Sequence, residues 1–341
     1  MPALLVKLRP EGAWRIGPGS GARGRAERVL SSDTLYSAVT QAMGALGWME
    51  PWLAATAGAG EGGPAVKLSS LFPAQEENLL APPPAHLWPA PAARLRTGGA
   101  RLIPTSLIRA LSLGEEWNED QWEVDGSSEC LLRRGRRRAV GSPYRFALRR
   151  QAAVDRLEPG RVALHETACI EFAEGAGLWC VAEFPGDSAR AEWAPRIEAA
   201  FRLLADSGLG GERRQGWGRF QLDRVESGSL SDLVLGRGRA ATAEAAAAEE
   251  RGWWLLSLFS PAESDKIDWT RGSVRMVERG GRVAGSGEAK LHSRMVGEGS
   301  VLLGGQPRGR AWNVAPPGFD AHPVWRSGFA VAIEMPWRAP A

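Results

Sequence analysis

A glycine-rich loop between a predicted helix and a predicted strand constrains the fold of this 341-residue chain most strongly. Residues 192–206 carry apolar side chains at helical spacing, and the segment GWGRFQLDRV after the loop alternates as a strand does. Glycine lets the backbone approach another molecule closely, and arginine binds phosphate. The loop therefore predicts either a grip on a polyanion or a generic helix-to-strand turn. It contains Gly208, Gly210, Gly211, Gly216, Gly218, Arg213, Arg214, Arg219, Trp217 and Phe220.

The order of elements around this loop indicates the fold class. Residues 3–9 alternate as a strand, residues 31–46 have helical spacing, and residues 161–184 favour two paired strands. Together with the helix, loop and strand above, this gives the strand–helix–strand–strand–helix–strand order of a ferredoxin-like unit. We expect an α+β protein with two ferredoxin-like (RRM-like) βαββαβ domains, the first with a large insertion.

The predicted domain boundaries follow shifts in composition. The first domain is expected at 1–227, with the insertion at about 50–150 and the glycine-rich loop at 207–220. A polar, alanine-rich linker at 228–251 leads to a C-terminal domain at 252–341, which opens with the apolar run WWLLSLF and closes with FAVAIEM.

Composition excludes several protein classes. A formal net charge of +3 excludes a histone-like polycation, although almost all of the 42 basic residues are arginines. The three cysteines have no CxxC spacing, so we expect no zinc site, no disulfide framework and a reducing, cytoplasmic location. The N-terminus alternates as a strand does and does not resemble a signal peptide. No apolar run approaches the about 18 residues that span a membrane, and no motif implies a cofactor.

Residues 133–150 form the most basic stretch, with eight arginines and no acidic residue. Strand-like runs flank Gly141-Ser142-Pro143, which predicts a basic hairpin or flexible arm there. A solvated charge run is the alternative. Eight like charges repel one another unless an anion is near, so the stretch favours a nucleic-acid partner.

Seven blocks distributed along the chain resemble one protein family. They are SSDTLYSAV, LSSLFPA with APPPAHLWP, RRQAAVDRLEPG, SGLGGERRQGWGRF, WLLSLFSP, MVGEGSVL and HPVWRSGFAVAI. In this order they resemble the RAMP superfamily of CRISPR proteins, specifically subunit four of the type III-A (Csm) effector complex. One departure is Ser32, where many relatives have histidine.

The resemblance implies an RNA-binding subunit without catalytic activity. Members of this family hold the 5′ handle of crRNA between two ferredoxin-like domains, beside the large polymerase/cyclase-like subunit and an adjacent backbone RAMP subunit. A thumb-like hairpin kinks the RNA, and residues 133–150 are our candidate for part of that thumb or its base.

The predicted RNA-binding residues fall into four groups. In the loop they are Gly208, Gly210, Gly211, Arg213, Arg214, Gly216, Trp217, Gly218 and Arg219; Leu209 and Phe220 are expected in the core. At the first helix, Ser31, Ser32 and Thr34 are expected to cap the N-terminus, where a phosphate also fits. Arg149 and Arg150 end the basic stretch, and Arg156 follows it. Lys290, His292 and Arg294 share one face of an extended segment, the alternative being an ordinary solvent-facing strand.

The main alternative function is an endoribonuclease of the same superfamily that processes precursor crRNA. General acid–base cleavage needs a histidine or a substitute at the scissile phosphate. The four histidines are scattered, at His86, His165, His292 and His322, and none lies near the loop or the first helix in sequence. We therefore expect no catalytic and no metal-binding residues.

Overall fold

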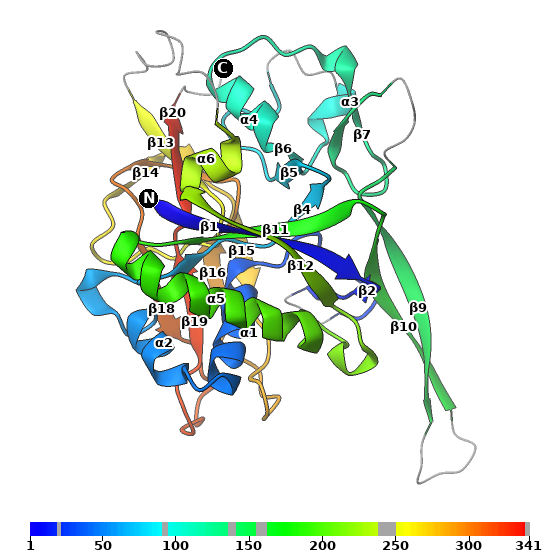
Figure 1. The fold of residues 1–341 in the computed structure, drawn as a ribbon, viewed down its shortest axis with the longest axis vertical. Coiled ribbons are helices and arrows are strands. Elements are labelled where there is room, and N and C mark those ends of the chain that lie inside the picture. Colours follow the sequence, from blue (N-terminus) through cyan, green and yellow to red (C-terminus); the bar gives the residue numbers. More distant parts are fainter. Residues whose placement is uncertain (19–21, 91–94, 136–140, 155–161, 238–249, 338–341) are drawn as a thin grey trace.

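The computed structural model describes residues 1–18, 22–90, 95–135, 141–154, 162–237 and 250–337 (Figure 1). The chain is an α+β protein in which every pairing between named strands is antiparallel. Its elements up to residue 124 are β1 (Pro2–Glu11), β2 (Ala13–Trp14), α1 (Ser32–Ala45), α2 (Met49–Ala55), η1 (Gly60–Gly62), β3 (Lys67–Leu68), β4 (Phe72–Gln75), β5 (Asn78–Ala81), α3 (Leu95–Gly98), β6 (Ile103–Pro104), α4 (Thr105–Ser112), η2 (Glu119–Gln121) and β7 (Trp122–Val124).

The next elements complete the N-terminal unit. They are β8 (Leu131–Arg133), β9 (Tyr144–Val154), β10 (Val162–Phe172), β11 (Ala176–Glu183), α5 (Asp187–Ser207), η3 (Arg213–Gln215), β12 (Arg219–Ser229) and α6 (Leu230–Leu235). The predicted first helix and the predicted helix before the glycine-rich loop are both present, as α1 and α5. Because α5 begins earlier than the apolar stripe suggested, Pro195 lies inside it and not in its first turn.

The central sheet has the strand order β12–β1–β11–β4–β5–β6, and β3 also pairs with β11. Strand β1 has the predicted alternation. Leu4, Val6 and Leu8 belong to the core beneath α1 and α5, whereas Ala3 and Leu5 belong to a second core on the opposite face. Both faces of this sheet are therefore buried, one under helices (Figure 1) and the other under the insertion and the C-terminal unit.

One strand predicted for the central sheet lies elsewhere. Strand β10 does not pair with β11; it pairs with β9 along its whole length and with β2 at Ile170 and Glu171. The short strands β3 and β4, from within the predicted insertion, take the place beside β11. Adjacency in sequence suggested the wrong partner, because the turn after β10 moves the chain from one sheet to another.

The basic hairpin is also displaced from its predicted position. The chain does not fold back at Gly141-Ser142-Pro143, since β8 pairs with β7 and β9 pairs with β10. The result is a long ribbon, β9–β10, that projects from the body of the molecule (Figure 1). Of residues 133–150, only Tyr144–Arg150 belong to the ribbon, as the first seven of the 11 residues of β9.

The C-terminal unit consists of strands. They are β13 (Arg251–Leu255), β14 (Ile267–Ser273), β15 (Met276–Arg279), β16 (Ser293–Val296), β17 (Val301–Gly304), β18 (Gly309–Asn313), β19 (Trp325–Phe329) and β20 (Ala332–Pro336). The main sheet has the order β14–β17–β13–β20. No helix lies within residues 250–337, so the two helices expected for a second βαββαβ domain are missing there. Trp254, Val301 and Ile333 pack instead into the core shared with the central sheet, which covers this face without helices.

Candidate nucleic-acid interface

A groove of about 320 Å³ lies where the glycine-rich loop, the start of α1 and the C-terminal unit meet. Six of its lining side chains are cationic: Arg15, Arg213, Arg279, Arg282, Lys290 and Arg326. Only two carboxylates, Glu27 and Asp33, face it. Since cations outnumber carboxylates three to one within one hollow, the groove attracts an anionic ligand.

The glycines of the loop mainly permit close packing. Gly208, Gly210 and Gly218 all have positive φ. A Cβ on Gly208 would lie 2.6 Å from the carbonyl oxygen of Trp217, and one on Gly210 or Gly218 would overlap a backbone carbonyl. The amides of Gly208, Gly211, Gly216 and Gly218 donate to protein carbonyls. These four amides are therefore occupied by the fold, so that among the five loop glycines only Gly210 has an amide without a backbone acceptor in the described residues.

The loop arginines face solvent. Arg213, Arg214 and Arg219 are exposed, and within the described part of the chain none has an ion-pair or hydrogen-bond partner for its guanidinium group. Trp217 is half-buried. Leu209 and Phe220 are 1% and 2% exposed, as predicted for core residues. The loop thus presents three unpaired guanidinium groups from a rigidly packed turn.

Arg15 anchors the loop from below. Its carbonyl accepts the Gly211 amide at 2.8 Å, and its buried guanidinium group donates to the carbonyls of Arg23 (2.8 Å) and Ala168 (3.0 Å). Burial lowers the pKa of Arg15, and nearby Arg23 adds to this effect against the opposing charge of Glu212. This arginine ties the loop to the base of the β9–β10 ribbon.

The predicted residues at the start of α1 have two different roles. Ser31 is the N-cap residue, but its hydroxyl makes no capping hydrogen bond, and it lines the groove together with Thr34. Ser32 is 2% exposed, and its Oγ accepts the Leu258 amide at 3.0 Å. Ser32 therefore joins the N-terminal and C-terminal units, and we leave it out of the proposed interface.

Asp33 holds two arginines from the C-terminal unit at the floor of the groove. It accepts hydrogen bonds from Arg279 at 2.8 and 3.1 Å, and Nε of Arg326 lies 3.5 Å from Oδ2. Burial disfavours the charge on Arg279, but the Asp33 carboxylate outweighs it and raises the pKa. Burial lowers the pKa of Arg326 despite Asp33. One carboxylate thus supports two buried guanidinium groups and leaves a net positive charge.

Of the three residues predicted on the C-terminal segment, one lies in the groove and two lie outside it. Lys290 lines the groove, and burial together with the charge of Arg326 lowers its pKa. His292 and Arg294 are exposed and lie outside the groove. The segment does not stay on one face of a single strand, because β16 begins only at Ser293, where it pairs with Arg279 of β15.

The arginines predicted on the basic stretch are paired with acids. Arg149 donates to Glu171, whose hydrogen bonds and charge raise the arginine pKa, and Arg150 donates to Glu166 at 3.0 Å. Both carboxylates lie on β10, so the charge of the stretch is partly neutralised across the ribbon. Arg156 lies outside the described residues.

Sequence reasoning missed four groove residues, Arg15, Arg279, Arg282 and Arg326. The sequence contains no clear motif that marks these four residues as binding residues. Arg279 and Arg282 flank the pair Gly280-Gly281, which indicated only a turn, and Arg326 lies in the block HPVWRSGFAVAI without any local motif. These residues come from parts of the chain that are distant in sequence, and only folding brings them to the loop.

The described residues provide little for a catalytic or metal site. None of the four histidines lines the groove. His86 is hydrogen-bonded to the Pro336 carbonyl, and His165 to Gln151 on the ribbon. No cluster of three or more His, Cys, Asp or Glu suited to a metal ion was found within the described residues. In the same residues, no helix has the length and apolar character needed to cross a membrane.

Comparison with known proteins gives a family for the C-terminal part of the chain. Residues 248–335 match the family model of the CRISPR Csm4 C-terminal domain. No curated protein sequence matches the chain.

Solved structures match the chain over its full length. A chain of the Csm3-Csm4 subcomplex of the type III-A CRISPR-Cas interference complex superimposes with a TM-score of 0.64 at 16% identity, covering 99% of this chain and 100% of that one. A chain of the Csm1-Csm4 cassette with pppApA gives 0.57 at 15% identity, covering 100% and 99%. The cassette with cA4 gives 0.56 at 16% identity and full coverage of both. The family model and the shared fold confirm the predicted resemblance to subunit four of the type III-A complex.

Proposed function

Because this chain has a Csm4 C-terminal domain and the fold of chains in solved Csm4 complexes, we propose that it is the Csm4 subunit of a type III-A CRISPR interference complex. In this role it is a non-catalytic, cytoplasmic RNA-binding subunit that holds the 5′ handle of crRNA. The observation that carries the proposal is the groove with six cationic side chains and two carboxylates.

The groove suits single-stranded RNA. Arg213, Arg214 and Arg219 have exposed guanidinium groups that contact phosphates or stack on bases. The hydroxyls of Ser31 and Thr34 lie on the opposite wall at the start of α1, where the helix dipole favours a phosphate. Arg279 and Lys290 supply positive charge from the C-terminal unit. The remaining loop residues, including Trp217, support the three loop arginines or lie next to them.

The proposal also covers the partners. The matched structures contain Csm3 or Csm1 together with Csm4. We infer that this chain docks the large polymerase/cyclase-like subunit, which Csm1 represents, and an adjacent backbone subunit, which Csm3 represents. The projecting β9–β10 ribbon is our candidate for the thumb that kinks the RNA, with residues 133–150 at its base.

The domain organisation is part of the same proposal. We assign a ferredoxin-like domain to 1–227, because β12, β1, β11 and β3 have the strand order of a βαββαβ sheet with α1 and α5 on one face. Residues 228–251 are assigned as the linker, which includes the end of β12, helix α6 and the first residue of β13. Residues 252–341 are assigned as the C-terminal domain. The described part of that second domain is a variant without helices.

An endoribonuclease that processes precursor crRNA is the competing function. Incubating the purified chain with labelled repeat RNA, with and without divalent metal, distinguishes the two. The proposal expects a stable complex with intact RNA under both conditions. Cleavage without metal would establish the endoribonuclease and overturn the non-catalytic assignment.

The first prediction concerns the RNA grip. Replacing Arg213 and Arg214 together with alanine is expected to weaken binding of the repeat-derived handle. The slope of log K against log salt is about −0.7 for each contact with a single-stranded phosphate, so the slope of the double variant should be less steep by about 1.4. Fluorescence anisotropy with labelled handle RNA at several salt concentrations measures this slope.

A matched control comes from helix α5. Arg202 is exposed and Arg190 is half-buried; they pair with Glu198 and Asp187 and do not line the groove. The Arg190→Ala/Arg202→Ala variant removes the same charge and should keep the wild-type slope. Equal slopes for both double variants would show that Arg213 and Arg214 face protein in the complex.

A further inference from the structure

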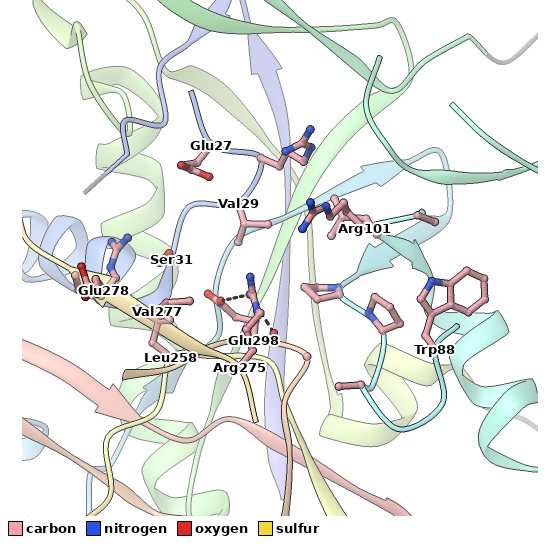
Figure 2. A pocket seen from close by; sticks show the side chains of 18 residues that line it. Glu27, Val29, Ser31, Trp88, Arg101, Leu258, Arg275, Val277, Glu278 and Glu298 are labelled. Carbon is pink, nitrogen blue, oxygen red and sulfur yellow. Dashed lines mark hydrogen bonds and ion pairs between the residues drawn. The ribbon is translucent and has the colours of Figure 1, made fainter. Parts of the chain in front are cut away.

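The unpaired positive charge of the groove lies on the side of the glycine-rich loop. Between the insertion and the C-terminal unit, a hollow of about 560 Å³ adjoins the groove (Figure 2). Its arginines have carboxylate partners, such as Glu298 at 3.7 Å for Arg275 and Glu129 at 2.8 Å for Arg28. A phosphate in this hollow would have to displace these carboxylates, whereas the loop arginines have no partner within the described residues. RNA that leaves the groove is therefore expected to run past the loop, where the β9–β10 ribbon projects (Figure 1).

The ribbon has one polar and one apolar face. In an antiparallel pair, partners across the strands project to the same face, and successive residues project to opposite faces. The register pairs Gln151 with His165 and places both on the polar face, whereas Leu148 and Leu164 lie on the other face. Gln151 is half-buried although it lies on a projecting ribbon, because the glycine-rich loop contacts it there.

Two glutamines join the polar face of the ribbon to the loop. Nε2 of Gln151 donates to Oε1 of Gln215 at 2.6 Å. On the loop side, Nε2 of Gln215 donates to Oε2 of Glu212 at 3.1 Å, and on the ribbon side Nε2 of His165 lies 2.9 Å from Oε1 of Gln151. We call these four side chains the clasp. Gln215 belongs to η3 together with two arginines of the proposed RNA grip, so the clasp ties that turn to the ribbon.

The hydrogen bonds of the clasp can run in only one direction. A carboxylate only accepts, so the Gln215 amide must turn its NH₂ group to Glu212 and its oxygen to Gln151. The Gln151 oxygen then faces His165, whose Nε2 must donate. Every donor therefore points towards Glu212, and turning one amide around breaks the chain of hydrogen bonds.

The clasp holds the ribbon further out than its other attachments do. Within the described residues, the other hydrogen bonds from the ribbon to the body lie nearer its base, in the pairing of β10 with β2 and between Arg15 and the Ala168 carbonyl. A two-stranded ribbon alone is marginally stable in water, so its outer part needs support to keep one orientation. The clasp supplies that support at Gln151 and His165.

We propose that Gln151 and Gln215 are positioning residues that hold the β9–β10 ribbon at a fixed angle to the glycine-rich loop. The inference rests on the proposed function and deepens it. RNA whose phosphates contact Arg213 and Arg214 then meets the ribbon a fixed number of nucleotides further along. The arginines supply the affinity, and the clasp decides at which nucleotide the ribbon unstacks the RNA.

Handle RNA that continues into guide sequence, with 2-aminopurine at successive positions, tests the proposal. This base fluoresces more strongly when it is unstacked, so the wild-type complex should show one bright position. Gln151→Leu removes one hydrogen bond, which shifts the ratio of fixed to free ribbon by about fivefold. The bright position should therefore dim and its neighbours brighten. Affinity for the handle alone should not change, because the loop arginines are intact.

Reversing the clasp distinguishes positioning from direct contact with RNA. Gln151→Glu alone should break the clasp, because the Gln215 oxygen would face a second acceptor. In Gln151→Glu/Glu212→Gln the Gln215 amide can turn around, donate to the carboxylate at position 151 and accept from the amide at position 212. This reversed variant should restore the single bright position. Glu212→Gln alone still offers an acceptor and should keep the wild-type profile.

A matched control for the added charge comes from β12. Gln221 is also exposed and also donates to a glutamate, Glu11, but it does not line the groove. Gln221→Glu therefore adds the same charge as Gln151→Glu and should keep the wild-type profile.

Spin labels measure the orientation of the ribbon without RNA. The three native cysteines are buried, so the labels attach to new cysteines at two exposed positions, Leu164→Cys on the ribbon and Asp206→Cys on α5. The distance distribution between the labels should be narrow in the otherwise wild-type protein and in the reversed variant. It should be broad in Gln151→Leu and Gln151→Glu. Equal widths in all four proteins would overturn the inference, whether or not RNA binds.

The RNA results separate this inference from the proposed function. Failure of the wild-type chain to bind handle RNA refutes the function itself. Binding without any bright position, or with the same bright position in wild type, Gln151→Leu and Gln151→Glu, refutes only the positioning role. A reversed variant as impaired as Gln151→Glu would assign Gln151 to direct contact with RNA and also overturn the inference.

Discussion

At the scale of single residues, Asp33 decides how much positive charge the groove contains. Its carboxylate faces both Arg279 and Arg326, and Lys290 adds a third cation whose pKa burial lowers. A buried guanidinium group without a counter-ion is expensive, so Asp33 allows two arginines to be held there. The excess charge that remains is available to a ligand.

Gly218 and Gly216 provide a matched pair for testing why the loop needs glycine. Both have φ near +80°, but a Cβ on Gly218 would overlap the Leu209 carbonyl, whereas a Cβ on Gly216 meets nothing within 4 Å. Gly216→Ala should cost about 1–2 kcal/mol through backbone strain alone. Gly218→Ala should cost about 1–3 kcal/mol more because the packed turn must move.

Urea denaturation followed by tryptophan fluorescence measures this difference. The expected order of midpoints is wild type, Gly216→Ala, then Gly218→Ala. If the two variants unfold at the same midpoint, backbone strain is the whole effect and close packing of Gly218 is not needed for stability.

At the scale of elements, the β9–β10 ribbon is a separable appendage. Its base is held by pairing with β2 and by the hydrogen bond from Arg15 to the Ala168 carbonyl. Along the ribbon Leu148 is exposed, and towards the tip Val162 and Leu164 are exposed as well. Exposed apolar side chains on a projecting ribbon contribute little to the fold of the isolated chain, which fits a surface that contacts another molecule.

Shortening the ribbon should leave the body folded. We expect replacement of residues 151–165 by Asn-Gly, a sequence that favours a two-residue hairpin turn, to change the melting temperature by less than about 3 °C. The same variant should bind handle RNA normally but lose affinity for longer RNA that continues past the handle. Equal loss for both RNAs, or none, would argue against the ribbon as the thumb.

At the scale of the whole molecule, the two units share one core. Leu5 and Phe72 of the central sheet pack in the same cluster as Trp254 and Ile333 of the C-terminal unit. The groove between the units therefore has a fixed width, since separating them would expose this core to water. His86 lies at the same junction, where it donates to the Pro336 carbonyl at 3.3 Å and stacks on Trp337 at 4.6 Å.

Acid should loosen this junction through His86. Burial lowers its pKa from the ordinary 6.5 to about 4, so the unfolded chain takes up the proton at a higher pH than the folded chain does. Stability is therefore lost as the pH falls from about 6.5 towards 4. His86→Phe keeps the stacking on Trp337 without a titrating group.

Melting temperatures between pH 7.5 and pH 5 check this expectation. The wild-type chain should lose more stability than His86→Phe over that range, because the carboxylates that also titrate are the same in both. Parallel curves for the two proteins would mean that His86 remains hydrated in the folded state.

Local patterns in the sequence were sufficient to predict β1, α1, α5 and the glycine-rich loop. In each case the pattern lies within one short segment of the chain. The alternation of Leu4, Val6 and Leu8 specifies a strand, an apolar stripe at helical spacing specifies a helix, and each pattern also specifies the face that the element buries. The loop was identified for the same reason. Four of its five glycines, Gly208, Gly210, Gly216 and Gly218, are at positive φ in the turn, and its arginines lie in the same short segment.

Tertiary structure decided which surfaces meet. It placed β3 and not β10 beside β11, paired Arg149 and Arg150 with carboxylates, buried Ser32, and brought Arg279, Lys290 and Arg326 to the loop. None of these follows from periodicity, because strand partners and ion pairs depend on contacts between residues far apart in the chain. The loop could be recognised as a candidate phosphate grip from its residues alone, but the opposite wall of its groove is built by the C-terminal unit, which reaches it only through the shared core.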